Sequence, residues 1–257
     1  MPVLAANLTM MFTEWAFLDR FAAAADAGFT AVEFLFPYAY DPDAIAKRLQ
    51  RHALTQALFN LPPGDWDKGE RGLAALPDRR DEFRASVGAA LRYAEATGVG
   101  RLHVMSGVAG RGDAAAMRAW RDAMLFACDE AGGHGLDIVI EPLNARDNPG
   151  YFLNDFSAAA ALIVSLRRGN FKLQYDIYHR QIMHGDVSVS LKDMMPLIGH
   201  IQIASVPGRN EPGSGELNDA MILRAIDTLG YRGFVGCEYR PAAGTMAGLG
   251  WMKTLVT

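Results

Sequence analysis

The stretch Leu136-Asp-Ile-Val-Ile-Glu-Pro-Leu-Asn144 contains an apolar run that ends in a carboxylate. Leu136 and residues 138–140 predict a short buried strand, because runs of β-branched residues favour strands. This strand delivers Glu141 directly onto a proline and a polar turn. A buried acid is unfavourable unless it has a partner. We therefore expect polar groups from other strand ends to converge on Glu141.

Short apolar runs alternate with longer helical patterns along the whole chain. The predicted strands are residues 3–6, 30–34, 54–59, 101–105, 137–140, 171–175, 198–203 and 233–237. The predicted helices are residues 12–27, 41–52, 78–97, 113–132, 154–166 with Asn154 as N-cap, a segment after 176, residues 216–229 and one helix in the tail 242–257. About eight such units, with no break in composition, predict an α/β fold, a single (β/α)8 TIM barrel over residues 1–257. An open doubly wound sheet is the alternative, but no GxGxxG or GxxxxGK[ST] motif is present.

Composition limits the class of protein and of partner. The chain has 257 residues, 50% of them hydrophobic, and a formal net charge of -4, which argues against a nucleic-acid partner. Its two cysteines, Cys128 and Cys237, fit a reducing compartment. The first residues lack the basic segment of a signal peptide, and no apolar run reaches the length of a membrane span. We expect a cytoplasmic protein without a membrane partner; a homo-oligomer is compatible with the sequence, which does not fix the number of subunits.

Polar residues stand at nearly all the predicted strand ends, where barrels of this kind carry their chemistry. In chain order they are Asn7, Glu33, Asn60, His103, Glu141, Asp176, Gln202 and Glu238. The last four lie on consecutive strands, so their oxygens can meet around one point. Three neighbouring carboxylates repel one another unless a cation neutralises them, and all-oxygen ligation suits Mg²⁺ or Mn²⁺ better than zinc. One strand-end acid taken alone is equally explained by a helix N-cap or an ion pair.

Three residues on loops lie close to these strand ends in sequence. His179 follows Asp176 by three residues, and a neutral imidazole there could hydrogen-bond a substrate oxygen. Arg209 lies on the Gly/Pro-rich loop after the seventh strand, where a guanidinium could bind a carboxylate. Trp66 lies on the long loop from residue 60 to residue 77 and could close over the site. A capping histidine and a solvated surface arginine are the simpler interpretations of the first two.

Several stretches in order along the chain carry a resemblance to one enzyme family. They are Asn7-Leu-Thr-Met-Met-Phe-Thr-Glu-Trp15, Val32-Glu-Phe-Leu-Phe-Pro-Tyr38, Asn60-Leu-Pro-Pro-Gly-Asp-Trp-Asp-Lys-Gly-Glu-Arg-Gly72, Glu141-Pro-Leu-Asn144, Tyr175-Asp-Ile-Tyr-His179, Gly199-His-Ile-Gln-Ile-Ala204, Gly208-Arg-Asn-Glu-Pro-Gly213 and Gly236-Cys-Glu-Tyr-Arg-Pro241. The sequence resembles the hydroxypyruvate isomerases and the related 2-oxo-tetronate isomerases of the xylose-isomerase-like barrel superfamily.

The resemblance implies a metal-dependent isomerase that interconverts hydroxypyruvate and tartronate semialdehyde through an enediolate. It implies that Glu141 and Glu238 form the acid/base pair, and that Mg²⁺ or Mn²⁺ is held by four ligands: Glu141, Asp176, Gln202 and Glu238. It also implies that His179 and Arg209 contact a small hydroxy-oxo acid, with Arg209 on its carboxylate. We expect Asn60, His103 and Trp66 to complete the substrate-binding residues.

Four alternatives remain open. A 2-oxo-tetronate isomerase or a ketose 3-epimerase would use the same chemistry, although the epimerases usually carry His where Gln202 stands. An apurinic-site endonuclease would share the barrel but needs several zinc ions and many His ligands, and this chain has six His. A non-catalytic barrel that binds sugars or acids would bind ligand without exchanging its protons.

Overall fold

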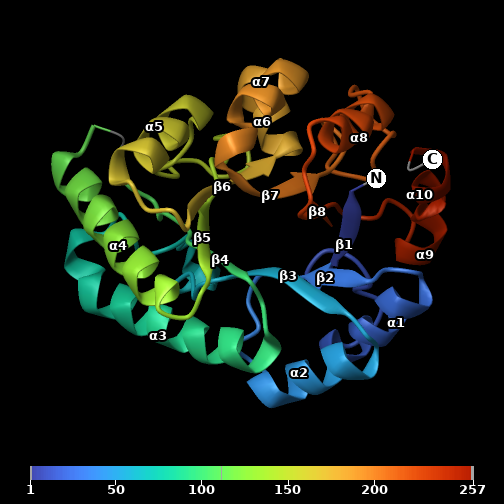
Figure 1. Ribbon diagram of the computed structural model, residues 1–257, viewed down its shortest axis with the longest axis horizontal. Helices are drawn as coiled ribbons and strands as arrows, with labels where there is room; N and C mark the ends of the chain where they lie inside the picture. Colours follow the sequence, from blue (N-terminus) through green and yellow to red (C-terminus); the bar gives the residue numbers. More distant parts are fainter. Residues whose placement is uncertain (1, 111, 256–257) are drawn as a thin grey trace.

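The eight strands close into a parallel barrel, in which each strand pairs with the next in sequence and β8 pairs with β1 (Figure 1). The computed structural model describes residues 2–110 and 112–255. The strands are β1 Val3–Asn7, β2 Ala31–Glu33, β3 Thr55–Asn60, β4 Arg101–His103, β5 Asp137–Ile140, β6 Phe171–Asp176, β7 Ile198–Ile203 and β8 Phe234–Cys237. The predicted TIM barrel is confirmed.

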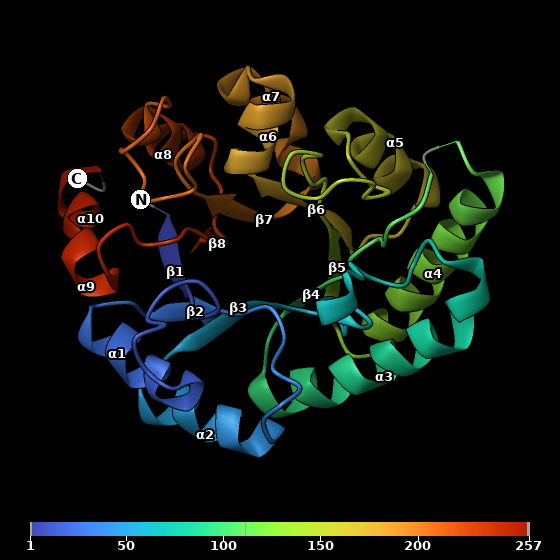
Figure 2. The ribbon, with the colours of Figure 1, turned by 180° about the vertical axis from the view of Figure 1, so that it is seen from behind.

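Helices surround the barrel in an outer ring, which is visible from both sides (Figures 1 and 2). They are α1 Arg20–Asp26, α2 Pro42–Arg51, α3 Arg80–Thr97, α4 Ala114–Gly132, α5 Phe156–Leu166, α6 Ile177–His184, α7 Val187–Met194, α8 Asp219–Thr228, α9 Thr245–Gly248 and α10 Gly250–Leu255. Short 3-10 turns occur at η1 Phe17–Asp19, η2 Trp66–Lys68, η3 Pro77–Arg79 and η4 Met195–Leu197. Among the described residues, none of the helices has both the length and the apolar character needed to cross a bilayer.

The first helix begins later than the apolar pattern of residues 12–27 predicts. Phe12 has a φ of 57°, a conformation that no α-helix contains. Its backbone N–H donates to Thr245 Oγ1 at 2.6 Å, which ties this turn to the C-terminal tail. Phe12 is fully buried all the same, so the apolar spacing reflects burial of a loop, and α1 begins only at Arg20.

Other element boundaries also differ from the predictions. Asp155, and not Asn154, caps α5, because its Oδ1 accepts the Ala158 N–H at 2.7 Å. The helix predicted over 216–229 begins at Asp219, after an Asn218 cap. Two helices, α6 and α7, follow β6, and the tail folds as α9 and α10 where one helix was predicted. Residues 256 and 257 of that prediction lie outside the described residues.

The apolar core lies mainly between the barrel and the helices, while the barrel interior contains small and polar side chains. Ala5, Ala31 and Ala57 form a separate buried cluster of their own. Bulky side chains such as Trp120 of α4 belong to the main cluster, as does Cys237. Side chains two residues apart on a strand share a face, so Asn7 and Glu33 lie above these alanines. These three alanines form a floor of small side chains in the barrel interior, and this floor leaves room for polar groups at the strand ends.

Two irregularities in strand pairing coincide with polar interior residues. The β2–β3 register shifts between Val32 and Glu33, and the β6–β7 register shifts between Leu173 and Gln174. Such irregularities re-aim a side chain and are common beside active sites. Gly236 of β8 gives the Glu33 carboxylate its space, because a Cβ at that position would overlap it. The backbone is therefore shaped locally to admit Glu33.

We expect Gly236→Ala to lower the free energy of unfolding by about 1–3 kcal/mol, the usual effect of overpacking. The added methyl group would push the Glu33 carboxylate out of its position. Urea unfolding measures the change. The matched control is Gly88→Ala in α3, where a Cβ meets no atom within 4 Å. That substitution should stabilise by up to about 1 kcal/mol through helix propensity, and equal effects of the two would contradict the prediction.

Candidate active site

The barrel mouth contains a cavity of about 210 Å³ that gathers most of the predicted site residues. Its lining includes both predicted acid/base residues and all five predicted substrate-binding residues: Glu141, Glu238, Asn60, His103, Trp66, His179 and Arg209. The remaining predicted ligands, Asp176 and Gln202, are each 1% exposed at the ends of β6 and β7. The structure therefore brings the strand-end groups of β5 to β8 to one place.

Arg209 stands between two of the three acids. Its Nη2 donates to Glu238 Oε2 and lies 3.5 Å from Asp176 Oδ2. The Tyr178 ring lies beside the guanidinium, with its centroid 4.8 Å from the Arg209 Cζ. Asp176 also has a structural role, because its Oδ1 accepts the Tyr178 N–H at 2.7 Å and so caps α6. One guanidinium thus contacts two of the three buried carboxyl groups.

Burial makes the charged forms of these acids unfavourable. Desolvation raises the pKa of Glu238 to about 8, against the opposing effect of Arg209, and the pKa of Asp176 to about 6. Desolvation, with the charges of Glu238 and Asp176, raises the pKa of Glu141 well above its ordinary range. Burial is the largest cause for all three acids, and neighbouring like charges add to it. A bound cation would remove the penalty.

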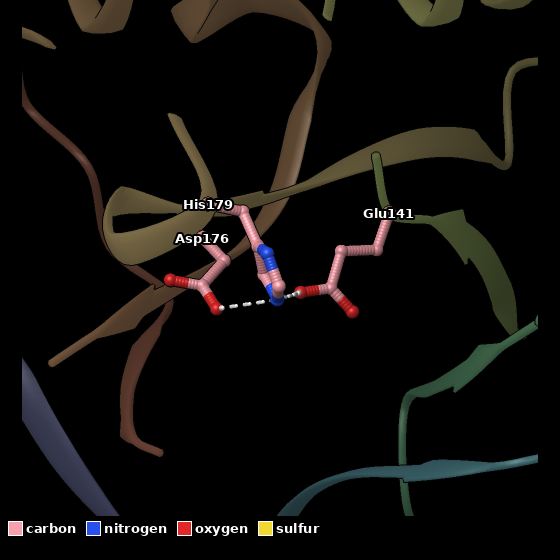
Figure 3. A group of neighbouring side chains, drawn as sticks. All are labelled: Glu141, Asp176 and His179. Atoms are coloured by element: carbon pink, nitrogen blue, oxygen red, sulfur yellow. Dashed lines mark ion pairs between the residues drawn. The ribbon is translucent and has the colours of Figure 1, made fainter. Parts of the chain in front are cut away.

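His179 lies between Asp176 and Glu141, as Figure 3 shows. Its Nε2 is 3.6 Å from Asp176 Oδ2 and 3.8 Å from Glu141 Oε1. Its Nδ1 accepts the backbone N–H of Asn144 at 3.0 Å. Since a backbone amide can only donate, Nδ1 carries the lone pair, and the neutral ring carries its hydrogen on Nε2. Burial lowers the pKa of His179 well below its ordinary value and keeps it neutral.

This tautomer decides what His179 can do. The side-chain atoms of Glu141, Asp176 and His179 lie within 4.8 Å of one another, a spacing that could hold a metal ion. An Nε2 that bears hydrogen is a donor, however, and cannot ligate a cation. His179 is therefore suited to donate to an oxygen in the cavity.

His103 offers a second neutral imidazole at the cavity wall. It is 1% exposed, and among the described residues neither ring nitrogen has a hydrogen-bond partner. Its Nε2 lies 3.9 Å from Glu141 Oε2. Burial, with a smaller effect of nearby His200, lowers the pKa of His103 to about 3. An uncharged, unpartnered imidazole that lines a cavity is available to a ligand.

A buried chain of hydrogen bonds joins the two acids underneath the cavity. Gln174 Nε2 donates to Glu141 Oε2 at 2.9 Å and to Gln202 Oε1 at 2.6 Å. Gln202 Nε2 in turn donates to Glu33 Oε1 at 2.8 Å. Asn7 Nδ2 donates to Glu33 Oε1 at 2.9 Å and reaches Glu238 Oε1 at 3.4 Å. The orientation of every amide in this chain is thereby fixed.

The hub of this chain is Glu33, which also accepts from His200 Nε2 at 2.7 Å. Asn7 and Glu33 are strand ends to which the sequence assigns no role, and Gln174 and His200 are not among the predicted site residues. A period of two would have found them, since Gln174 precedes Asp176 by two residues and His200 precedes Gln202 by two. Residues at that spacing face the same interior.

The donor set fits a divalent cation. Glu141 Oε1 is buried and has no hydrogen-bond partner in the part of the chain that the structure describes. Gln202 turns its amide nitrogen toward Glu33, so its oxygen faces Gln174, and one lone pair stays free for another ligand. With Asp176 and Glu238, these groups offer the oxygen ligands that Mg²⁺ and Mn²⁺ prefer.

Comparisons with known proteins point to one family. A sequence model of the xylose isomerase-like TIM barrel family matches residues 21–255. The chain is 53% identical over 255 residues to 2-oxo-tetronate isomerase from Cupriavidus necator, covering 98% of both chains. It is 42% identical over 249 residues to hydroxypyruvate isomerase from Escherichia coli, covering 96% of both. A crystal structure described as an AP endonuclease, family 2, from Brucella melitensis is similar with a TM-score of 0.96 and 47% identity, covering 99% of both chains.

We expect Glu33→Ala to lower the free energy of unfolding by about 2–5 kcal/mol, because it leaves buried donors of Asn7, Gln202 and His200 without an acceptor. Glu33→Gln should lose less, because His200 can move its hydrogen to Nδ1, which has no hydrogen-bond partner within residues 2–110 and 112–255, and can then accept at Nε2. Urea unfolding measures both, and ¹⁵N shifts of the imidazole report the tautomer. Equal destabilisation by the two variants, with an unchanged tautomer, would refute the assignment of Glu33 as the hub.

We expect Mg²⁺ or Mn²⁺ to displace protons when it binds. The pKa of Glu238 is raised from 4.5 to about 8, so most of this carboxyl is protonated at pH 7 and must ionise to become a ligand. The affinity should rise as the pH increases from about 6 to about 8. Calorimetry in buffers of different ionisation enthalpy counts the released protons; Glu238→Gln should release fewer, and release of none by the wild type would contradict the prediction.

The raised pKa of Glu238 also affects the stability of the metal-free protein. A raised carboxyl pKa means that the folded state binds the proton more tightly than the unfolded chain. Its contribution to stability is therefore full below pH 4.5 and is lost as the pH rises through about 8. Unfolding curves of metal-free protein at several pH values measure this loss.

Proposed function

The chain belongs to the xylose isomerase-like TIM barrel family, and on that premise we propose that it is an isomerase that interconverts hydroxypyruvate and tartronate semialdehyde. One observation carries the proposal. Two buried acids with raised pKa values, Glu141 and Glu238, line the same cavity from β5 and from β8. Two neighbouring carboxyl groups with raised pKa values can share one proton, so that one of them acts as a base while the other acts as an acid.

The reaction moves one proton between neighbouring carbons. One of the two acids, as carboxylate, takes a proton from the hydroxyl-bearing carbon of hydroxypyruvate, which leaves an enediolate. The other, as the acid, returns a proton to the adjacent carbon, the hydroxyl proton passes to the former carbonyl oxygen, and the product is an aldehyde. A divalent cation held by Glu141, Asp176, Gln202 and Glu238 would supply Lewis-acid stabilisation of the negative charge that develops on the two substrate oxygens.

Other side chains position the substrate. The Nε2–H of His179 donates to a substrate oxygen, and a neutral donor suits an oxygen that gains charge during the reaction. Arg209 contacts the substrate beside Glu238, while Asn60 and His103 line the wall. The loop that carries Trp66 limits access of water to the enediolate, as barrel lids do.

A second candidate is the isomerisation of a 2-oxo-tetronate. The observation that favours it is the 53% identity with the relative from Cupriavidus necator that bears this name. The chemistry and the residue roles stay the same, and only the length of the substrate changes. A ketose 3-epimerase would use the same pair of acids on a neutral sugar.

The similarity to a structure described as an AP endonuclease raises DNA cleavage as a further candidate. The cavity lining holds as many acids (Glu141, Asp147 and Glu238) as arginines, so it lacks the excess of basic residues that binds a nucleic-acid backbone. Within the described residues, only one group of three His, Cys, Asp or Glu side chains has metal-binding spacing. The geometry thus favours the small-molecule isomerase.

Solvent deuterium incorporation tests the proposal directly. The protein is incubated in D₂O with Mg²⁺ or Mn²⁺ and with hydroxypyruvate, a 2-oxo-tetronate or a ketose, and carbon-bound deuterium is followed by NMR. The proposal requires exchange and isomerisation of hydroxypyruvate. Exchange of the four-carbon acid alone would support the second candidate, and cleavage of an abasic-site duplex with Zn²⁺ would support the endonuclease.

We expect Glu238→Gln to lower turnover and deuterium exchange by at least about 10²–10⁴-fold, the usual effect of losing a general acid or base. The amide has nearly the same shape but cannot accept or deliver the proton, so hydroxypyruvate should still bind. Steady-state kinetics and calorimetry separate the two effects. Near-normal activity of this variant would exclude Glu238 from the acid/base pair.

A further inference from the structure

We propose that Arg71, on the loop over the barrel mouth, binds the carboxylate of the substrate and so selects hydroxy-oxo acids over neutral sugars; this rests on the proposed function. Three arginines line the cavity: Arg71, Arg209 and Arg240. The guanidinium of Arg209 is already shared by Glu238 and Asp176. It therefore brings little uncompensated charge to an anionic substrate.

Arg71 carries a charge that no carboxylate neutralises within the described part of the chain. Its guanidinium stacks on Trp66, with Cζ 3.7 Å from the ring centroid. Its Nη1 donates to the carbonyl oxygens of Trp66 at 3.1 Å and Glu70 at 2.8 Å. The Nε and Nη2 edge makes no hydrogen bond in residues 2–110 and 112–255. That edge is the one that binds carboxylates bidentately.

The neighbouring acid is turned elsewhere. Glu70 Oε1 pairs with Arg79 Nη1 at 2.8 Å, and Glu70 Oε2 accepts the Asp65 N–H at 2.6 Å. The hydrogen bond with Arg79 contributes most to lowering the pKa of Glu70, and it outweighs the opposing effect of desolvation. Glu70 is thus paired with Arg79 instead of Arg71, and the charge of Arg71 remains available to a ligand in the cavity.

The loop holds Arg71 in a fixed place. The Arg71 carbonyl accepts the Gly107 N–H at 3.0 Å, and the Gly72 N–H donates to the Pro63 carbonyl at 2.8 Å. Gly72 forms a β-bridge with Ser106 and has a φ of 110°, and a Cβ there would overlap the Met105 carbonyl. An arginine on an anchored backbone and a stacked ring loses little entropy when it binds a ligand.

The acids on the cavity wall explain why an anionic substrate needs an arginine whose charge is not already neutralised. Asp147 lines the same cavity, and Glu141 and Glu238 add negative charge there when they ionise, which is unfavourable for a substrate carboxylate. Arg71 offsets this repulsion at the loop and places the carboxylate there. The hydroxyl-bearing and carbonyl carbons of a short acid are then directed toward Glu141 and Glu238. A ketose, which lacks the carboxylate, gains nothing from Arg71.

The test compares two probes that differ only in this group, hydroxypyruvate and dihydroxyacetone, whose hydroxymethyl group replaces the carboxylate. Binding is measured by calorimetry with Mg²⁺ in the Glu141→Gln background, which prevents turnover and keeps the pairing of Glu238 with Arg209 intact; Glu141→Ala replaces it if that variant does not fold. Arg71→Met should weaken hydroxypyruvate binding about 10- to 100-fold, the range of a lost charge-assisted hydrogen bond. Dihydroxyacetone binding should be unchanged, and Arg71→Lys should lose less than Arg71→Met.

The control is Arg84→Met, which removes an arginine stacked on Phe126 in the groove between α3 and α4, away from the cavity. It should leave both affinities unchanged. Hydroxypyruvate binding that survives Arg71→Met, an equal loss for both probes, or a carboxylate-selective loss in Arg240→Met instead would overturn the proposal. Deuterium exchange by the wild type tests the isomerase function separately, so failure of one is distinguishable from failure of the other.

Discussion

The arrangement of this barrel follows from one unfavourable interaction, the repulsion among three carboxyl groups buried at the ends of neighbouring strands. Glu141, Asp176 and Glu238 lie where water cannot screen them, and the single guanidinium of Arg209 compensates only part of their charge. The hydrogen-bonded chain through Glu33 holds the surrounding amides in place, and the neutral histidines add no further charge. In the function that we propose, this otherwise destabilising concentration of acids is the site that holds a cation and transfers a proton.

The sequence predicts the barrel and the main acids because both depend on local periodicity. The alternation of strands and helices specifies the barrel, and each strand end then identifies a residue such as Glu141. The interior chain depends instead on contacts between distant segments, as between Asn7 and Glu238. The register shifts at Glu33 and Gln174 arise from pairing of whole strands and leave no local pattern.

The errors in the predicted elements have similar physical causes. Asn154 and Asp155 are adjacent and both are good helix caps, so spacing alone cannot choose between them. Phe12 fits a helical pattern because it is buried, while its backbone conformation depends on Thr245 near the other end of the chain. The role of His179 likewise depends on Asn144, whose backbone amide sets the tautomer from another strand end.

The alanine floor of the barrel contributes little to the hydrophobic stabilisation of the molecule. Ala5, Ala31 and Ala57 bury little apolar surface, so most of the hydrophobic stabilisation comes from the layer between strands and helices. The interior above the floor is occupied by polar groups that serve the site. Substitutions in the outer layer can therefore change thermal tolerance without altering the cavity, whereas substitutions of interior residues such as Glu33 change stability and the site together.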